Sequence, residues 1–246
     1  MANGSSIEWT DATWNPVTGC DKISPGCKHC YAERMAKRLQ AMGVERYRHA
    51  FEVTLHHDLL HAPKMWRSSR LVFVNSMSDL FHEQVPTAFI KEVFRTMGAC
   101  PQHTFQVLTK RSGRLLAIAD ELEWAPNIWM GVTVESPAFI SRIRHLAKVP
   151  AYVRFLSIEP LLASITSLPL NGIHWVIVGG ESGPGARPMQ QSWVESILHE
   201  CRQQRVAFFF KQWGGVRKGQ AGRLLNGQTY SEMPLNFVTA STTSRA

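Results

Sequence analysis

The feature that most constrains the fold is a repeated unit, in which an apolar, β-branched or aromatic run ends in a polar cluster and leads into a helix-like segment. Six such runs are clear, at residues 71–74, 104–108, 128–132, 152–156, 175–178 and 206–210. Two weaker runs precede them, at 14–17 and 51–55. Helical patterns separate most of the runs, at residues 30–42, 86–97, 112–120, 136–147 and 190–203. Apolar strands that alternate with helices predict a parallel sheet covered by helices.

Eight strand–helix units in a chain of this length favour one architecture. A single (β/α)8 barrel commonly has about 250 residues, and this chain has 246. We therefore predict an α/β fold of the (β/α)8-barrel type, in complete, partial or irregular form, with an open doubly wound sheet as the alternative. No Gly/Ser-rich or Pro-rich linker divides the chain. We expect residues 1–238 to form one domain, with a cysteine loop at 20–30, and residues 239–246 to form a disordered tail.

Composition excludes two classes of protein. Hydrophobic residues make up 44% of the chain and charged residues 19%, which excludes global disorder. A membrane-spanning helix needs about 20 consecutive apolar residues, and the sequence contains no such run. The N-terminal segment has no basic cluster followed by an apolar stretch, as a secretory signal would have. We therefore expect a cytoplasmic protein with no membrane partner.

The chain is basic, with 27 Lys and Arg against 19 Asp and Glu, a formal net charge of +8. Basic residues gather on the predicted helix after the cysteines and again near Trp213: Arg34, Lys37, Arg38, Arg217, Lys218 and Arg223. Basic side chains beside aromatic rings suit phosphate neutralisation and base stacking. DNA or RNA is therefore a candidate partner, although a charge of this size is also compatible with solubility alone.

Three of the five cysteines lie within eleven residues, in the pattern C-x6-C-x2-C: Cys20, Cys27 and Cys30. Thiolates favour zinc, copper(I) and iron–sulfur clusters. Structural zinc usually has four protein ligands, whereas a [4Fe–4S] cluster on three cysteines leaves one iron open to another ligand. The pattern favours such a cluster, with zinc completed by a histidine as the alternative. Cys100 and Cys201 stand alone in apolar surroundings and are predicted to fill the core.

Polar side chains follow the predicted strands. In a barrel the carboxyl ends of all strands meet at one mouth, where ligands bind, so we expect these side chains to surround one cavity. They are His56, Asn75, Ser78, Asp79, Lys110, Glu135, Glu159, Glu181 and Lys211. Carboxylates gathered in a pocket of low dielectric tend to have raised pKa values. We predict that Asp79, Lys110 and Lys211 are the catalytic residues and that they contact the substrate.

A three-cysteine loop after the first strand of a barrel resembles the radical S-adenosylmethionine (SAM) superfamily. The commonest motif there is C-x3-C-x2-C, so this chain departs by three inserted residues. The resemblance implies that the open iron binds the amino and carboxylate groups of SAM, and that reduction by a donor such as flavodoxin or ferredoxin yields a 5′-deoxyadenosyl radical. Gly179-Gly180-Glu181 is similar to a superfamily motif that meets the amino end of SAM, although that motif usually follows the second strand and here follows the seventh.

On this resemblance we predict which residues contact the cofactor. The predicted SAM contacts are Tyr31, Asn75, Ser78, Glu135, Ser157, Glu159, Gly179, Gly180 and Glu181. The predicted ligands of the [4Fe–4S] cluster are the three cysteines of the loop.

Over nearly its whole length the chain also resembles a phage-associated family of uncharacterised proteins with a three-cysteine motif. The segments that carry the resemblance are IEWT (7–10), TWNPVTGC (13–20), CKHCYA (27–32), LTKR (108–111), SIEP (157–160), VGGESG (178–183), KQWGG (211–215) and EMP (232–234). We therefore predict an iron–sulfur enzyme of radical SAM type that modifies or repairs a substrate, with a nucleic-acid base as the leading class. The alternatives are a zinc-stabilised nucleic-acid-binding phage protein without catalysis and a phage-encoded interaction protein whose barrel is only a scaffold.

Overall fold

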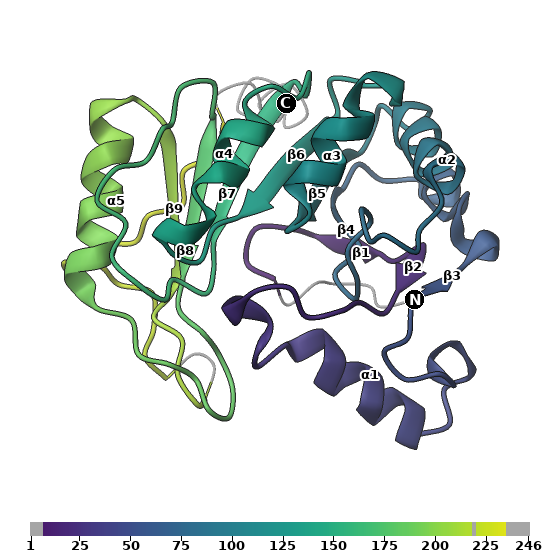
Figure 1. The fold of residues 1–246 in the computed structure, drawn as a ribbon, viewed down its shortest axis with the longest axis horizontal. Coiled ribbons are helices and arrows are strands. Elements are labelled where there is room, and N and C mark those ends of the chain that lie inside the picture. The colour runs from purple at the N-terminus through teal and green to yellow at the C-terminus, as the bar shows by residue number, and fades with distance from the viewer. Residues whose placement is uncertain (1–6, 218–219, 235–246) are drawn as a thin grey trace. The chain divides into compact units, whose positions relative to one another are not determined.

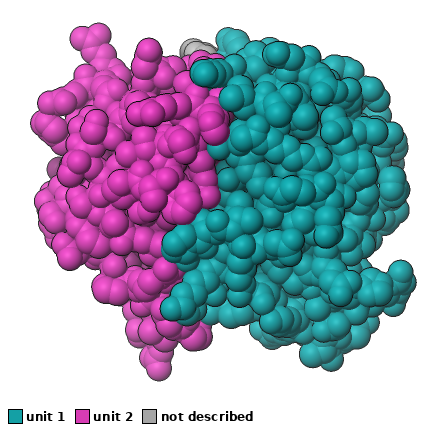
Figure 2. Space-filling model, in the orientation of Figure 1, with its two compact units in different colours: residues 1–131, 148–152 teal, residues 132–147, 153–246 magenta. Residues whose placement is uncertain are grey.

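The computed structural model describes residues 7–217 and 220–234. The chain divides into two compact units (Figure 2). Unit 1 comprises residues 1–131 and 148–152, and unit 2 comprises residues 132–147 and 153–246. The tail predicted at 239–246 lies outside the described residues. That residues 1–238 form one domain stays a prediction.

Seven strands form one sheet, in the order β1-β4-β5-β6-β7-β8-β9 (Figure 1). Their bounds are β1 Ala12–Trp14, β4 Leu71–Val74, β5 Thr104–Thr109, β6 Ile128–Thr133, β7 Val153–Ile158, β8 Trp175–Gly179 and β9 Ala207–Gln212. Within unit 1, β4 pairs in parallel with β1 and with β5. Within unit 2, β8 pairs in parallel with β7 and with β9. The predicted α/β fold is confirmed, in the partial rather than the complete form of the barrel.

The predicted number of eight strands in this sheet is wrong. Of residues 51–55, only Thr54–Leu55 (β3) is a strand, and it pairs antiparallel with Val17–Thr18 (β2) in a separate two-stranded sheet. The first strand of the main sheet ends at Trp14, two residues before Pro16, whose nitrogen has no hydrogen to donate to a ladder. An apolar run predicts a strand, but it does not show which sheet the strand joins.

The five predicted helical segments each contain a helix. The α-helices are α1 Tyr31–Ala41, α2 Thr87–Gly98, α3 Ser112–Ile118, α4 Ser141–Leu146 and α5 Gln191–Gln203. The short 3-10 helices are η1 Pro25–Cys27, η2 Glu45–Tyr47, η3 His57–Leu59, η4 Ala62–Met65, η5 Ala119–Glu121 and η6 Pro137–Phe139. None of the described helices has the length and apolar character that a bilayer crossing requires.

The core consists of strand residues and of the apolar faces of the helices. Every residue of β6 and of β8 is buried, as expected for strands covered on both faces. Helix α2 is amphipathic and buries Phe89, Ile90, Val93, Phe94 and Met97. Burying each such side chain contributes roughly 1.5–3 kcal/mol. Cys100 and Cys201 are 1% and 0% exposed, so they fill the core as predicted.

Candidate cysteine-loop site

The loop that carries the three cysteines connects β2 to α1 within unit 1. Gly19 begins it with a φ of +85°, and a Cβ there would lie 2.1 Å from the carbonyl oxygen of Glu52, so glycine is required. The amide of Gly19 donates to the carbonyl of Met77 at 3.0 Å. The amide of Cys20 donates to the carbonyl of Phe51 at 3.1 Å. These bonds anchor the first cysteine to two other segments of the unit.

The other two cysteines lie at the turn into α1. Cys27 ends η1, and Cys30 is the N-cap residue of α1. Cys30 packs against a small cluster formed by Ala32, Ala36 and Met77, which anchors this end of the loop. All three loop thiols are free and half-buried. None is consumed by a disulfide, so each can serve as a ligand.

A buried arginine contacts the first cysteine. Arg111 lies between β5 and α3 and is 6% exposed. Its Nη1 donates to Cys20 Sγ at 3.4 Å and lies 3.2 Å from Asp79 Oδ2, and its Nε donates to Glu83 Oε2 at 2.8 Å. Burial lowers the pKa of Arg111, but the charge of Asp79 and the hydrogen bond to Glu83 outweigh it, so the pKa lies above its ordinary value. The guanidinium therefore stays charged beside the Cys20 sulfur.

Asp79, a predicted catalytic residue, receives four hydrogen bonds. Its Oδ1 accepts from the amide of Phe81 at 3.0 Å and from Thr109 Oγ1 at 2.7 Å. Its Oδ2 accepts from the amide of Lys110 at 3.0 Å and from Arg111 Nη1 at 3.2 Å. The side chain is buried, and its bonds tie the loop after β4 to the end of β5. This arrangement gives Asp79 a positioning role, and contact with a substrate stays a prediction.

The loop thiols have different electrostatic surroundings. Burial first and the charge of Asp79 second raise the pKa of Cys20 to about 11. Burial also raises the pKa of Cys27, but the charge of Lys110 and hydrogen bonds within the loop outweigh it, so this pKa lies below its ordinary value. Lys110, a predicted site residue, therefore lies close enough to Cys27 to act on it.

Three predicted cofactor contacts lie beside the loop in unit 1. The Tyr31 hydroxyl donates to the carbonyl of Ser76 at 2.5 Å, and Ser78 Oγ donates to the carbonyl of Val17 at 2.8 Å. Asn75 has a φ of 60°, and its Oδ1 accepts from the amide of Val17 at 3.3 Å. The Asn75 Nδ2 is buried without an acceptor among the described residues. The structure thus brings these three residues to the cysteine loop.

The loop offers three thiols, which is the kind of donor set that holds a [4Fe–4S] cluster. Within residues 7–217 and 220–234, no group of three or more His, Cys, Asp or Glu side chains is arranged to hold a single metal ion. A [4Fe–4S] cluster binds each cysteine through a different iron, so its thiols need not converge on one point. Two buried N–H groups near the loop, Asn75 Nδ2 and Arg111 Nη2, have no acceptor in the same residues. Sulfur or oxygen atoms of a bound group would supply acceptors of the kind these donors lack.

The three predicted carboxylates of unit 2 each have a basic partner. The pairs, with their nitrogen–oxygen distances, are Glu135–Arg142 at 2.8 Å, Glu159–Lys211 at 2.8 Å and Glu181–Arg187 at 2.5 Å. Glu135 is 0% exposed, and its partner also lies over the ring of Phe139, with the guanidinium carbon 4.2 Å from the ring centroid. Buried carboxylates require such compensation. Ser157, another predicted contact, is buried within β7.

Close packing explains the glycines of the Gly179-Gly180-Glu181 motif. A Cβ on Gly180 would lie 1.9 Å from the carbonyl oxygen of Trp213, so no side chain fits there. A Cβ on Gly179 would lie 3.2 Å from the carboxyl carbon of Glu159. The Glu181 carboxylate accepts both the Nε and the backbone amide of Arg187, at 2.8 and 2.9 Å. Contact of this motif with SAM stays a prediction.

The predicted site residues therefore fall into two groups, one in each unit. Unit 1 holds Cys20, Cys27, Cys30, Tyr31, Asn75, Ser78, Asp79 and Lys110. Unit 2 holds Glu135, Ser157, Glu159, Gly179, Gly180, Glu181 and Lys211. That all of them surround one cavity stays a prediction.

Sequence reasoning predicted Lys211 but missed three arginines that pair with predicted carboxylates: Arg111, Arg142 and Arg187. Arg111 adjoins the predicted Lys110 at the end of β5, and its position after a strand was the same signal that pointed to the lysine. Arg142 and Arg187 lie seven and six residues after the carboxylates that they pair with. No periodic pattern singles out such a spacing, so the sequence carried no signal for these two.

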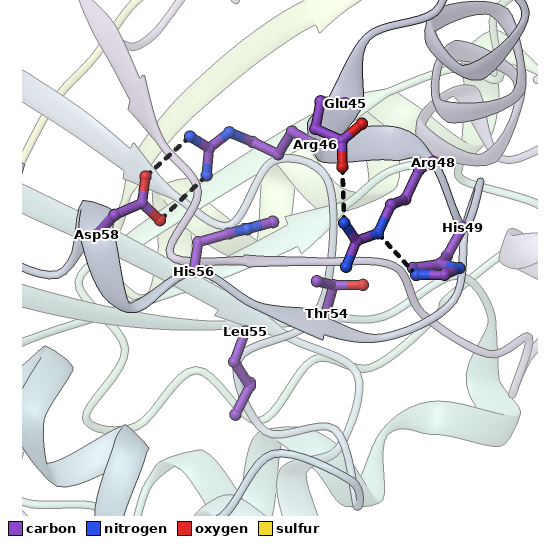
Figure 3. Close-up of a pocket in the computed structure, with 8 residues that line it drawn as sticks. All are labelled: Glu45, Arg46, Arg48, His49, Thr54, Leu55, His56 and Asp58. Atoms are coloured by element: carbon purple, nitrogen blue, oxygen red, sulfur yellow. Dashed lines mark hydrogen bonds and ion pairs between the residues drawn. The ribbon is translucent and has the colours of Figure 1, made fainter.

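An open pocket of about 330 Å³ lies beside β3 and the 3-10 helices η2 and η3 (Figure 3). Its lining residues are Glu45, Arg46, Arg48, His49, Thr54, Leu55, His56 and Asp58. Figure 3 shows that its charged side chains pair with one another, Arg46 with Asp58 and Arg48 with Glu45. The nitrogen–oxygen distances of the two pairs are 3.0 and 2.6 Å. Because these guanidinium groups already have carboxylate partners, the pocket offers less chemistry than the cysteine loop.

The fold is similar to that of two solved structures. One is spore photoproduct lyase complexed with dinucleoside spore photoproduct, with 10% identity, a TM-score of 0.45, and coverage of 76% of this chain and 59% of that chain. The other is a double mutant of spore photoproduct lyase with bound AdoMet and dinucleoside spore photoproduct, with 10% identity, a TM-score of 0.51, and coverage of 82% of this chain and 64% of that chain. This chain thus spans less than two thirds of the length of either structure.

A search of curated proteins finds no match to the sequence. Residues 4–234 match the protein family described as "Protein of unknown function (DUF5131)". The match includes the cysteine loop, the Arg111 region and the strand ends of both units. Because it covers nearly the whole chain, the protein belongs to the DUF5131 family.

Proposed function

We propose that this protein is an iron–sulfur enzyme of radical SAM type, which holds a [4Fe–4S] cluster on Cys20, Cys27 and Cys30. The observation that carries the proposal is the loop itself, in which three free, half-buried thiols lie on a segment anchored at both ends. Three thiolates leave one iron of such a cluster open to a further ligand. A fold similar to that of a structure with bound AdoMet is consistent with SAM as this ligand.

With SAM on the open iron, the reduced cluster would supply one electron to SAM, and the two groups together would supply radical chemistry at the substrate. The chain's own residues bind and orient. Arg111 holds the Cys20 sulfur, and Asp79 holds Arg111. Asn75 Nδ2 is a buried donor without an acceptor in the described chain, and we propose that it meets the cofactor.

Further cofactor contacts are proposed at the strand ends of unit 2. Glu135, Ser157, Glu159, Gly179, Gly180 and Glu181 lie at or after the carboxyl ends of β6, β7 and β8. Ligands bind at the carboxyl ends of strands in α/β folds. The carboxylates already have basic partners, so a cationic group of SAM would compete with or share these pairs.

The substrate class that we propose is a nucleic-acid base, with Lys110 and Lys211 in contact with the substrate. The net charge of +8 favours association with a polyanion. The two similar structures are described as bound to a dinucleoside spore photoproduct, which is consistent with this class. The proposed electron donor is a small redox protein of the flavodoxin or ferredoxin kind.

The test is anaerobic purification and reconstitution with iron and sulfide, followed by reduction with dithionite in the presence of SAM. We expect a brown protein with about four irons that releases 5′-deoxyadenosine. The C27A variant should lose both iron and product. The matched control is C100A, which removes the same side chain from the core and should retain both. A colourless wild-type protein with one zinc, or a C27A variant that keeps its iron, would contradict the proposal.

The substrate class has its own test. Release of 5′-deoxyadenosine is measured with and without added single-stranded DNA, duplex DNA and RNA, at two salt concentrations. We expect a nucleic acid to stimulate release at low salt, with the effect weakening as salt rises. If none of the three changes the rate, a nucleic-acid substrate is excluded while the cofactor assignment stands.

A further inference from the structure

The guanidinium of Arg111 makes a contact that its burial does not require. A buried charge needs an opposite charge, and Asp79 Oδ2 supplies it at 3.2 Å. Glu83 Oε2 accepts from Nε at 2.8 Å and supplies a second one. The third contact, from Nη1 to the sulfur of Cys20 at 3.4 Å, adds nothing to this charge compensation. A guanidinium that acts on the ligands of the cysteine loop would need this contact with the sulfur.

The neighbouring groups fix the guanidinium in this position. Asp79 is itself held by the amides of Phe81 and Lys110 and by the hydroxyl of Thr109. The amide of Arg111 donates to Thr109 Oγ1 at 2.9 Å, so the backbone and the side chain of Arg111 are both tied to the same network. An arginine with its planar fork held on two sides presents its remaining N–H in a fixed direction.

The loop thiols differ in the donors that face them. Cys20 faces the charged Nη1 of Arg111, whereas the Cys27 sulfur lies 3.6 Å from the neutral hydroxyl of Ser24. Hydrogen bonds to the sulfur ligands, and charges near them, set the reduction potential of an iron–sulfur cluster. Reduction adds one electron and therefore one negative charge, which a fixed cation stabilises.

We propose that Arg111 is a positioning residue that holds the Cys20 thiolate through an N–H···S bond and raises the reduction potential of the cluster. The inference rests on the proposed function, since it needs a cluster on the three cysteines. In this role the guanidinium stays protonated in both redox states, and no proton accompanies the electron. Without it the reduced cluster is less stable relative to the oxidised cluster.

The test compares R111Q, R111K and the control R95Q in the reconstituted protein. Arg95 is an exposed residue of α2 that pairs with Glu123, so R95Q removes the same charge from the same unit without touching the loop. The midpoint potential is measured by a redox titration followed by electron paramagnetic resonance, together with iron content and the urea unfolding midpoint. We expect R111Q to shift the reduction equilibrium roughly tenfold toward the oxidised cluster, ~59 mV for one electron. R111K, which keeps the charge but not the planar fork, should shift it less, and R95Q should leave it unchanged.

The possible outcomes separate the role of Arg111 from the proposed function. A wild-type protein that binds no cluster overturns the proposed function, and this inference with it. If the wild-type protein binds a cluster and R111Q and R111K have the same potential as the wild type, the inference is overturned but the proposed function stands. A merely structural arginine would change the unfolding midpoint and not the potential. If R111Q fails to fold, R111K decides. A folded R111Q that has lost its iron, while R95Q retains it, supports the role of Arg111 in holding Cys20.

Discussion

Asp79 Oδ2 lies 3.2 Å from Arg111 Nη1, and the two side chains are 8% and 4% exposed. This pair joins the loop after β4 to the junction of β5 and α3 within unit 1. The same guanidinium reaches Cys20, so the position of the first cysteine depends on a buried ion pair outside the cysteine loop.

Substitution of Asp79 tests that dependence. We expect D79N to lower the free energy of unfolding by about 3–5 kcal/mol, because it leaves the buried Arg111 guanidinium without its main partner. Glu83 contacts the same guanidinium but is 66% exposed, so E83Q should cost at most about 1 kcal/mol. Urea unfolding of the metal-free protein measures both. Equal losses of unfolding free energy in D79N and E83Q would show that burial does not set the strength of the Asp79–Arg111 ion pair.

The glycine motif in unit 2 offers a second test of structure, independent of any cofactor. We expect G180A to destabilise the protein by about 1–3 kcal/mol, because the added methyl group would meet the backbone of Trp213. Gly113 in α3 has open space at the Cβ position, so G113A should be neutral or stabilise by about 0.5–1 kcal/mol. Urea midpoints of the two variants are compared. A fully stable G180A would point instead to a cofactor reason for this glycine.

The Glu181–Arg187 pair is tested by a double-mutant cycle. From the unfolding free energies of E181Q, R187Q and the double variant, we expect a coupling energy of about 1–3 kcal/mol. A parallel cycle on the more exposed Arg46–Asp58 pair should give at most about 1 kcal/mol. Calorimetric titration with SAM adds a functional comparison, since a carboxylate that meets the cofactor predicts weaker binding in E181Q than in R187Q. Equal SAM affinity in both variants would remove Glu181 from the proposed contacts.

Stability should depend on pH through three histidines. Burial lowers the pKa values of His56, His103 and His174 below the ordinary 6.5. The folded protein then binds fewer protons than the unfolded chain, so this stability is complete above pH 6.5 and is lost as the pH falls below it. Each histidine contributes at most ~1.4 kcal/mol per pH unit.

Substitution of His174 gives the clearest test of this pH dependence. Its Nδ1 accepts a hydrogen bond from the amide of Arg154 at 3.0 Å and cannot be protonated without losing this bond. We expect H174Q to have a shallower fall in urea midpoint between pH 6.5 and 5 than the wild type. The control H199Q changes an exposed histidine of α5 and should leave the slope unchanged. A slope that is identical in all three proteins would refute the assignment.

Much of the fold could be predicted from sequence because its strands are long apolar runs. The runs at 104–108, 128–132 and 175–178 coincide with β5, β6 and β8 to within one residue at each end. The run at 51–55 was misplaced, because a pairing such as Val17 with Leu55 depends on where the chain turns. Local apolar pattern carries no such information.

The candidate site was predictable in its residue types but not in its pairing. Cysteines at close spacing predict a ligand loop by their chemistry alone, and their role as ligands stays a prediction. By contrast, Lys211 contacts Glu159 across 52 positions of sequence, and only the parallel packing of β7, β8 and β9 brings the ends of these strands near each other. The sequence therefore located the charged groups without showing that they neutralise one another.

The division of the chain has a practical consequence. The polypeptide passes between the two units three times, after residues 131, 147 and 152, so neither unit is a continuous stretch of sequence. A gene fragment that stops after residue 131 would lack the 148–152 segment of unit 1, and one that stops after residue 152 would also encode the 132–147 segment of unit 2. Experiments that seek unit 1 without any residues of unit 2 should therefore begin from an internally joined gene rather than from a simple truncation.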